Sequence, residues 1–395
     1  MKAGWDLANI GDVCDVVNGG TPKTGVSAYW GGQHQWITPA EMGKRSTPYV
    51  SQTDRTITDQ GLQNSSARPL PPQSVILSSR APIGHLVINM TPMATNQGCK
   101  GLVPRGRVDH KFLYYYLGSI VDLLNDLGTG ATFKELSGGK LKEVPIPLPP
   151  LPEQQRIVTL LDEAFDGIAT ARAHAEKNLK NARAIFESYL QSVFTQWGNG
   201  WEEKTLEQIS TTFGRGKSKH RPRNDPALYG GRYPFIQTGD VRNAGHFITA
   251  FSQTYSEAGL AQSKLWPKGT ICITIAANIA ETGILGFDAC FPDSVIGVVP
   301  NPNEAEVGFV EYLLQSFKVR IQALGQGSAQ ANINMGTFEN ERFPFPGVAE
   351  QRRIVAKLDD LSEETQRLES LYQRKLTALD ELKKSLLTQA FSGAL

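Results

Sequence analysis

The hexapeptide Glu153-Gln154-Gln155-Arg156-Ile157-Val158 decides the fold, because it recurs in the same chain as Glu350-Gln351-Arg352-Arg353-Ile354-Val355. The two copies lie 197 residues apart. Matches elsewhere keep that offset: Leu161-Asp162 recurs as Leu358-Asp359, Phe194 as Phe391, and Phe112 as Phe309. Units of this length are too long for a solenoid. The repeat therefore indicates a duplication that gives two similar modules with a pseudo-two-fold relation.

Each copy begins with a module rich in glycine, proline and threonine, over residues 1–150 and 198–346. The offset drifts there, and Trp36-Ile37-Thr38 aligns with Phe235-Ile236-Gln237-Thr238. Short apolar runs predict strands at residues 75–78, 86–88, 270–275 and 294–299. One helix per module is predicted, at residues 110–124 and 308–324. The predicted fold class is therefore α+β, with two similar mixed α/β domains.

A proline-rich segment closes each module, at residues 145–152 and 344–346. Because proline interrupts both helices and sheets, we interpret these segments as stiff hinges. The next stretch, residues 153–196, has no proline and one glycine, and residues 350–391 have neither. Each stretch can form ~60 Å of helix. We therefore assign residues 151–197 and 347–395 to two long helices that act as spacers.

Apolar residues repeat along both long helices in steps of four and three. The first seam is Ile157, Leu161, Ala164, Ile168, Ala171, Ala175, Ala182, Ile185 and Tyr189, interrupted by Asn178. The second is Ile354, Leu358, Leu361, Leu368, Tyr372, Leu379, Leu382 and Leu386, with Thr365 and Lys375 as breaks. Small side chains in one seam and large ones in the other favour packing of the two helices against each other, and the connectivity of the chain then favours an antiparallel coiled coil. A separate homodimer seam for each helix is the alternative.

Charge alone gives little support for nucleic-acid binding. The 395 residues carry a net charge of +1. Residues 1–152 have 14 Lys+Arg against 11 Asp+Glu, and residues 199–346 have 13 against 14. Any DNA-binding surface must therefore be a local basic patch. Two such patches on a helical spacer suit a DNA site with half-sites roughly 34–36 Å apart.

The cysteines and the apolar segments exclude several other classes. Cys14, Cys99, Cys272 and Cys290 form no C-x-x-C pair, which favours reduced, buried thiols over a disulfide framework or a zinc site. No apolar stretch approaches the ~20 residues of a membrane helix. The first ten residues include Asp6 and have no apolar signal region. We therefore expect a cytoplasmic protein with no membrane partner.

The first hinge and helix start, Leu148-Pro149-Pro150-Leu151-Pro152-Glu153-Gln154-Gln155-Arg156-Ile157, is similar to the signature of the specificity (S) subunit of type I restriction-modification enzymes. Residues 128–133 and 325–330 also resemble that family's loop before the hinge. The second hinge departs from the signature, because it continues Gly347-Val348-Ala349 before Glu350. The resemblance covers the whole chain and implies target-recognition domains at residues 1–150 and 198–346.

The resemblance also implies partners and cofactors. In this family two modification (methyltransferase) subunits carry S-adenosylmethionine and methylate adenine, and restriction (endonuclease/translocase) subunits add ATP- and Mg²⁺-dependent translocation and cleavage. The S subunit binds double-stranded DNA and is not an enzyme, so no cofactor is expected on this chain. The outer helix faces should be available to the modification subunits. They carry Arg172, Lys180 and Arg183 on the first helix and Glu363, Glu364, Arg367 and Arg374 on the second.

Motifs for catalysis are absent from the sequence. Gly216-Lys217-Ser218 resembles the end of a phosphate-binding loop, but Thr211 stands where the first glycine is required. Asn301-Pro302-Asn303 lacks the aromatic face that adenine methyltransferases use to stack a flipped base. We therefore predict no catalytic and no metal-binding residues.

Polar and basic residues on loops and after strands are the candidates for DNA contact. In the first module they are Thr21, Lys23, Thr38, Arg80, Asn96, Gln97, Thr132 and Lys134. In the second they are Arg215, Lys217, Lys219, Arg221, Arg223, Gln237, Thr238, Arg242, Asn278, Gln326, Gln330 and Asn332. The basic run from Arg215 to Arg223 is predicted to be equivalent to residues 19–24. A non-catalytic coiled-coil scaffold that binds protein partners without reading DNA is the alternative function.

Overall fold

The structure is a computed structural model that describes residues 4–130, 134–219, 222, 224–276, 278–325, 333 and 335–395. The chain divides into two units. Unit 1 comprises Met1–Glu176 and Arg374–Leu395, and unit 2 comprises Lys177–Gln373. Each unit thus holds one predicted module with part of each long helix. No helix among the described residues has the length and apolar character needed to cross a membrane.

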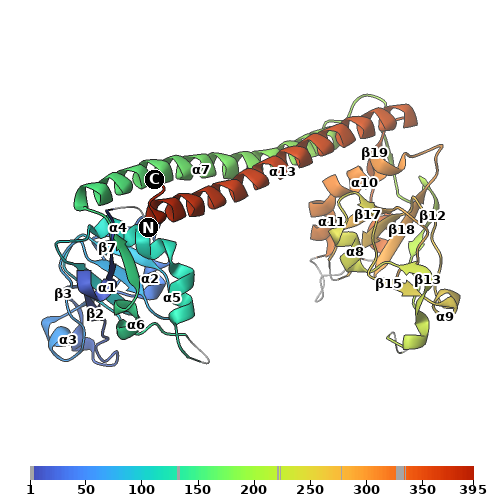
Figure 1. The fold of residues 1–395 in the computed structure, drawn as a ribbon. Coiled ribbons are helices and arrows are strands. Elements are labelled where there is room, and N and C mark those ends of the chain that lie inside the picture. Colours follow the sequence, from blue (N-terminus) through green and yellow to red (C-terminus); the bar gives the residue numbers. More distant parts are fainter. Residues whose placement is uncertain are drawn as a thin grey trace. The chain divides into compact units, whose positions relative to one another are not determined.

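Unit 1 is built on a five-stranded sheet with the strand order β2-β9-β6-β7-β4, of which β2 and β7 are labelled in Figure 1. Its strands are β2 (Cys14–Asn18), β9 (Cys99–Pro104), β6 (Val75–Ser78), β7 (Leu86–Asn89) and β4 (Tyr49–Val50). β4 runs parallel to β7, and the other neighbours are antiparallel. The central β6 is buried at every residue, which accounts for its continuous apolar run. The strands predicted at residues 75–78 and 86–88 are confirmed.

A smaller sheet in unit 1 has the order β5-β3-β8. Its strands are β5 (Thr56–Ile57), β3 (Trp30–Ile37) and β8 (Met93–Thr95). β3 is antiparallel to β5 and parallel to β8. The end of β3, the end of β8 and the start of β5 therefore meet at one edge of this sheet.

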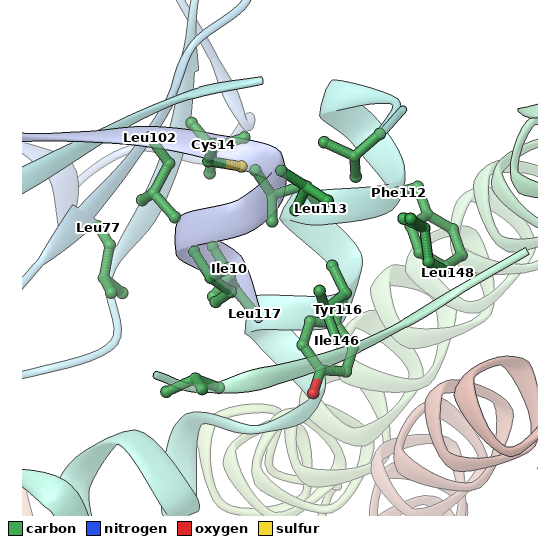
Figure 2. Close-up of a cluster of buried hydrophobic side chains, with 14 of the residues drawn as sticks. Ile10, Cys14, Leu77, Leu102, Phe112, Leu113, Tyr116, Leu117, Ile146 and Leu148 are labelled. Carbon is green, nitrogen blue, oxygen red and sulfur yellow. The ribbon is translucent and has the colours of Figure 1, made fainter. Parts of the chain in front are cut away.

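The helix predicted at residues 110–124 is two helices, α4 (His110–Ser119) and α5 (Val121–Leu127), which meet at Ile120. Phe112, Leu113 and Leu117 of α4 are fully buried. Figure 2 shows them gathered with Leu77 and Leu102 of the sheet in one apolar cluster. The short helices of unit 1 are α1 (Ile10–Val13), η1 (Ser27–Tyr29), α2 (Pro39–Met42), α3 (Asp59–Gln63) and α6 (Gly138–Lys142).

Unit 2 repeats this architecture. Its five-stranded sheet has the order β12-β18-β16-β17-β14. The strands are β12 (Ser210–Arg215), β18 (Val295–Pro300), β16 (Ile271–Thr274), β17 (Thr282–Leu285) and β14 (Phe247–Ile248). The smaller sheet pairs β13 (Tyr229–Phe235) with β15 (Gln253–Tyr255). In place of β8 there is a single parallel bridge from Phe235 to Cys290. The duplication and the strands predicted at residues 270–275 and 294–299 are confirmed.

The helices of unit 2 also follow those of unit 1. The one predicted at residues 308–324 is again split, into α10 (Val307–Ser316) and α11 (Lys318–Gly325). The remaining helices are η2 (Pro226–Leu228), α8 (Thr238–Asn243), α9 (Glu257–Ala261) and α12 (Met335–Glu339).

The proline-rich segments, which the sequence predicts to be stiff hinges, each contribute to a short strand. β10 (Pro145–Leu148) pairs with β1 (Asp6–Asn9), and β19 (Phe343–Phe345) pairs with β11 (Glu202–Lys204). Among the described residues, each of these two sheets has two strands. Each proline-bearing strand therefore has a free edge, where a residue without an N–H costs no ladder hydrogen bond.

The long helices α7 (Leu151–Thr195) and α13 (Val348–Ser392) have 45 residues each. Within unit 1, Arg156 donates to the Leu395 carbonyl at 3.0 Å, and Arg172 donates to Asp380 at 2.5 Å. Within unit 2, Asn178 donates to the Tyr372 hydroxyl at 3.2 Å. Residue numbers rise on one helix as they fall on the other. The predicted antiparallel pairing is therefore confirmed within each unit.

The predicted seam is wrong at three positions. Ile185 is 49% exposed and Leu382 is 47% exposed. On the second helix, the seam position that was predicted to be the polar break at Lys375 is occupied by the next residue, Leu376, which is 8% exposed. The cause is that each helix takes two four-residue steps in succession, from Asn178 through Ala182 to Phe186 and from Leu368 through Tyr372 to Leu376. Such an insertion shifts the seam by one residue.

Ion pairs between the helices have a fixed polarity. Arg172 on α7 pairs with Asp380, and Arg183 on α7 pairs with Glu369 at 2.9 Å. These arginines were predicted to lie on a free outer face, whereas they join the two helices. At the repeat offset, Glu369 corresponds to Arg172 and Asp380 to Arg183. Antiparallel α7–α7 pairing would oppose two arginines, and α13–α13 pairing two acids. The charges therefore disfavour the homodimer-seam alternative.

A buried glutamine joins each module to its long helix. Gln154 is fully buried, donates to the Arg107 and Pro149 carbonyls at 2.9 and 2.8 Å, and accepts from the Asp109 N–H at 2.8 Å. Gln351 makes the same three bonds, to the Glu304 and Pro346 carbonyls and from the Glu306 N–H. The repeated Glu-Gln dipeptide therefore has a structural role, because its glutamine satisfies three backbone groups of the module.

Candidate nucleic-acid interface

Several predicted DNA-contact residues of unit 1 meet at the edge of the smaller sheet. Thr38 follows β3 and caps α2 by accepting from the Glu41 N–H at 3.3 Å. Asn96 and Gln97 follow β8. Since β3 and β8 are parallel, their ends lie at the same edge. We call this region the β3 edge of unit 1.

The β3 edge is held together by side-chain hydrogen bonds. Asn96 donates to the Thr21 hydroxyl at 2.9 Å and accepts from the Gly98 N–H at 2.7 Å. The Thr21 hydroxyl is also bonded to Gln97. A Cβ at Gly98 would lie 3.1 Å from Asn96 Oδ1 and 3.2 Å from Arg80 Cγ. Four predicted residues, Thr21, Arg80, Asn96 and Gln97, are therefore brought together.

An acidic residue orients the cations beside this edge. Arg80 pairs with Glu135 at 3.3 Å, and the nearly buried Lys100 lies 3.8 Å from the same carboxylate. Lys134 is exposed and donates to the Asn125 carbonyl at 3.4 Å. The predicted residue Thr132 lies outside the described residues.

Two indole groups fix the loop at residues 19–24. The Trp36 N–H donates to the Gly20 carbonyl at 2.9 Å, and the Trp30 N–H donates to the Lys23 carbonyl at 3.3 Å. Gly19 packs against strand-end backbone, where a Cβ would lie 1.9 Å from the Asn96 oxygen. The loop thus has no room for a side chain at its first residue, and it holds Lys23 exposed at the surface.

The basic loop of unit 2 is equivalent, as predicted. The Gly216 N–H donates to the Val295 carbonyl and the Lys217 N–H to the Phe291 carbonyl, as those of Gly19 and Gly20 do to Cys99 and Thr95. Its anchors differ, because Ser263 donates to the Lys217 carbonyl at 2.8 Å and Gln262 accepts from the Lys219 N–H at 2.6 Å. Lys217 and Lys219 are exposed.

The other candidates of unit 2 lie in three places. Gln237 precedes α8, Thr238 opens that helix, and Gln237 donates to Gln253 at 2.7 Å. Arg242 donates to Asn278 at 3.4 Å. Arg215 is directed back to the chain, because its guanidinium donates to the Asp293 carbonyl. The predicted residues Arg221, Arg223, Gln326, Gln330 and Asn332 lie outside the described residues.

Sequence reasoning missed Arg55 and Gln253, which stand at the same edges. Arg55 immediately precedes β5, and Gln253 is the first residue of β15. Strands of two and three residues carry no alternation that would reveal them. The signal that could have found them is the cluster of polar residues just before Thr56-Ile57 and Thr254-Tyr255.

The part of the chain that the structure describes holds no group of three or more His, Cys, Asp or Glu that could bind a metal ion. All four cysteines are free and buried. Burial raises the pKa of Cys14 and of Cys99 to about 12, and it also raises the pKa of the Cys272 and Cys290 thiols. These thiols are therefore protonated and unsuited to nucleophilic chemistry at neutral pH.

The sequence comparisons with known proteins all point to the same family. The family model for the type I restriction modification DNA specificity domain matches residues 2–180 and 198–377. The MjaIX specificity subunit of a type I restriction enzyme from Methanocaldococcus jannaschii is 37% identical over 195 residues. That match covers 49% of this chain and 43% of the relative, so it spans less than half of that relative. The EcoKI specificity subunit of Escherichia coli is 21% identical, over 100% of this chain and 90% of the relative.

Two solved structures have the same fold. One, described as the structural basis underlying complex assembly and conformational transition of the type I R-M system, aligns at a TM-score of 0.80 and 18% identity. It covers 100% of this chain and 99% of its own. The HsdS subunit from Thermoanaerobacter tengcongensis aligns at a TM-score of 0.67 and 19% identity, covering 100% of this chain and 98% of its own.

Proposed function

Because the chain belongs to the type I restriction modification DNA specificity family, we propose that it recognises a bipartite site on double-stranded DNA and directs adenine methylation and cleavage by partner subunits. In this proposal the chain itself is not an enzyme. Two modification subunits bind S-adenosylmethionine, and restriction subunits bind ATP and Mg²⁺.

One observation carries the proposal: the same sheet edge occurs in both units but presents different polar side chains. Unit 1 has Thr38, Asn96 and Gln97 there, and unit 2 has Gln237 and Gln253. These residues are all able to donate to or accept from base edges, while Lys23 and Lys217 are exposed beside them for phosphates. Two readers that differ in this way suit two different half-sites.

The decisive experiment is an adenine-methylation map of host DNA with and without this gene, at single-base resolution. We expect one asymmetric bipartite motif to lose methylation when the gene is deleted. An unchanged methylation pattern would rule the proposal out.

A second measurement separates DNA recognition from a scaffold that only binds proteins. The purified complex of this chain with its modification subunits is titrated with a duplex that carries the mapped motif, at two salt concentrations. Each phosphate contact steepens the salt dependence, so affinity should fall by roughly 10³-fold or more between 50 and 200 mM salt. Salt-independent binding, or no binding, would favour the scaffold.

A further inference from the structure

Arg55 and Gln253 occupy the same position in the two units. In unit 1, the backbone N–H of Trp36 donates to the backbone carbonyl of Arg55 at 3.2 Å, and Trp36 is paired in parallel with Ala94. In unit 2, Phe235 is paired with Gln253 and forms its parallel bridge with Cys290. Trp36 thus corresponds to Phe235. The residue beside it, at the start of the antiparallel strand, is an arginine in one unit and a glutamine in the other.

The Arg55 guanidinium lies over an aromatic surface. Its central carbon is 3.7 Å from the centroid of Trp30 and 5.4 Å from that of Trp36. The two indoles pack edge to face with centroids 5.0 Å apart and support each other. Arg55 is exposed, and no ion pair among the described residues includes it. A stacked guanidinium keeps its N–H edge available and has already lost much of its side-chain freedom.

The platform is continuous with the β3 edge. Trp30 and Trp36, which carry the guanidinium, also hold the Lys23 and Gly20 carbonyls of the adjacent loop. Because β5 is antiparallel to β3, the start of β5 lies at the end of β3. Arg55 is therefore at the same edge as Thr38 and Asn96, and not on an unrelated surface.

In unit 2 the same position is held by an amide. Gln253 is exposed, and its carbonyl oxygen accepts from Gln237 at 2.7 Å. That oxygen keeps a second lone pair, and the amide nitrogen has two N–H donors. Gln237 is itself tied to α8, because its N–H donates to Asp240 at 2.8 Å. Gln253 is thus held in place by a neighbour that the helix has fixed.

We propose that Arg55 and Gln253 are base-reading residues at equivalent positions, Arg55 for a guanine in the half-site of unit 1 and Gln253 for an adenine in that of unit 2. The inference rests on the proposed function. Arginine matches the O6 and N7 acceptors of guanine with two N–H groups, and glutamine matches the N6 donor and N7 acceptor of adenine. The identity of the side chain at one shared position then contributes to the difference between the half-sites.

The test compares Arg55→Lys and Arg55→Gln with wild type in the complex with modification subunits. Methylation is measured on a duplex library randomised over both half-sites. Arg55→Lys keeps the charge but loses the planar fork, so preference for one guanine in the first half-site should fall by about 5- to 150-fold. Arg55→Gln should move that preference towards adenine. Neither variant should alter the second half-site.

Gln253→Arg is the reciprocal variant and should move one preference in the second half-site from adenine to guanine. Arg105→Lys is the matched control, because Arg105 is also an exposed arginine of unit 1 but follows the end of β9, whereas the β3 edge lies at the start of that strand, and it should leave both half-sites unchanged. Equal melting temperatures of the variant and wild-type complexes show that folding is intact.

Two results would overturn the inference. A loss for Arg55→Lys and Arg55→Gln that is uniform over all library sequences would make Arg55 a phosphate contact. An unchanged preference at every position would remove it from the interface. Failure of the proposed function is distinguishable from both, because the wild-type complex would then select no bipartite motif from the library.

Discussion

The two units share every strand of the five-stranded sheet. They differ at the edge of the smaller sheet and in a cluster of buried polar side chains around Glu311. Gln154 and Gln351 make the same three backbone bonds in both units. In contrast, the arginine that lies over an indole in unit 1 is replaced in unit 2 by a glutamine that is hydrogen-bonded to a second glutamine. The comparison separates positions that the fold requires from positions that it leaves open.

A second difference is buried. In unit 2 the Glu311 side chain is fully buried and accepts from Thr282 and Gln315, each at 2.7 Å, and lies 2.6 Å from the His246 ring. The equivalent residues of unit 1 are Tyr114, Leu86, Gly118 and Pro48, as the shared pairing of β4–β7 with β14–β17 and the repeat offset indicate. Unit 1 thus has uncharged residues at all four of these positions and still forms the same sheet, so the fold does not require this polar cluster.

The largest effect is expected for Glu311→Leu. The substitution removes a buried acceptor and leaves the Thr282 and Gln315 donors and the His246 ring without it, at about 1–3 kcal/mol for each buried group. Urea unfolding followed by hydrogen exchange should show this loss in unit 2. Tyr114→Leu, at the equivalent position of unit 1, is the control and should cost less. A loss below ~1 kcal/mol for Glu311→Leu would contradict the assigned hydrogen bonds.

Substitution of Gln154 and Gln351 tests the junction between module and long helix, which the two units share. Gln154→Leu and Gln351→Leu each leave three backbone groups of one module without a partner, at roughly 1 kcal/mol or more per group. We expect equal losses of about 3 kcal/mol in the free energy of unfolding, measured by urea titration. Gln155→Leu is the control, because Gln155 is exposed on the same turn. Clearly unequal losses would show that the two junctions are not equivalent.

The polarity of the helix pair predicts a smaller, reversible effect. The double variant Arg172→Glu, Arg183→Glu places acids against Asp380 and Glu369. Exposed pairs contribute about 0–1 kcal/mol each, so the melting temperature should fall by a few degrees. Adding Asp380→Arg and Glu369→Arg should restore it. A quadruple variant that stays at the melting temperature of the double variant would refute charge pairing as the cause.

The smallest effect on the native chain is expected for thiol labelling of the buried cysteines. Because each unit has its own cysteines, labelling can follow the unfolding of each unit separately. Cys14 and Cys99 belong to unit 1, and Cys272 and Cys290 to unit 2. At pH 8 a thiol reagent should label none of them in the native chain, and labelling in rising urea should report each unit in turn. Glu311→Leu should advance labelling of the unit 2 cysteines only. Rapid labelling of native wild type would show that the thiols are accessible.

The same thiols give a pH dependence with a defined sign. Burial raises the pKa of Cys14 from 9.0 to about 12. The folded state therefore favours the neutral thiol, and its stabilising contribution is complete below pH 9 and is lost as pH rises towards about 12. Cys14→Ala should reduce this alkaline loss of stability, as measured by urea titrations at several pH values.

Long-range regularity could be predicted from the sequence, whereas single side-chain positions could not. The helices followed from 45-residue stretches with a sustained heptad pattern, and Thr38 followed from its place after an apolar strand. The seam shift was missed because Ile185 and Phe186 are both apolar, so that spacing alone does not choose between them. Arg55 was missed because its strand has only two residues and its aromatic partner lies 25 positions earlier.

Unit 2 is one continuous segment, whereas unit 1 combines Met1–Glu176 with Arg374–Leu395. The segment Arg374–Leu395 supplies core residues. The ring centroid of Phe391 lies 5.2 Å from those of Phe112 and Tyr116, and Ala390 is fully buried. A ribosome makes the chain from its N-terminus, and domains fold as their residues emerge. Unit 2 therefore has all of its chain before unit 1 does. The module that comes first in the sequence is therefore completed last. Until Phe391 has been synthesised, the side chains of Phe112 and Tyr116 lack their apolar partner and are exposed on one side, where a chaperone could bind.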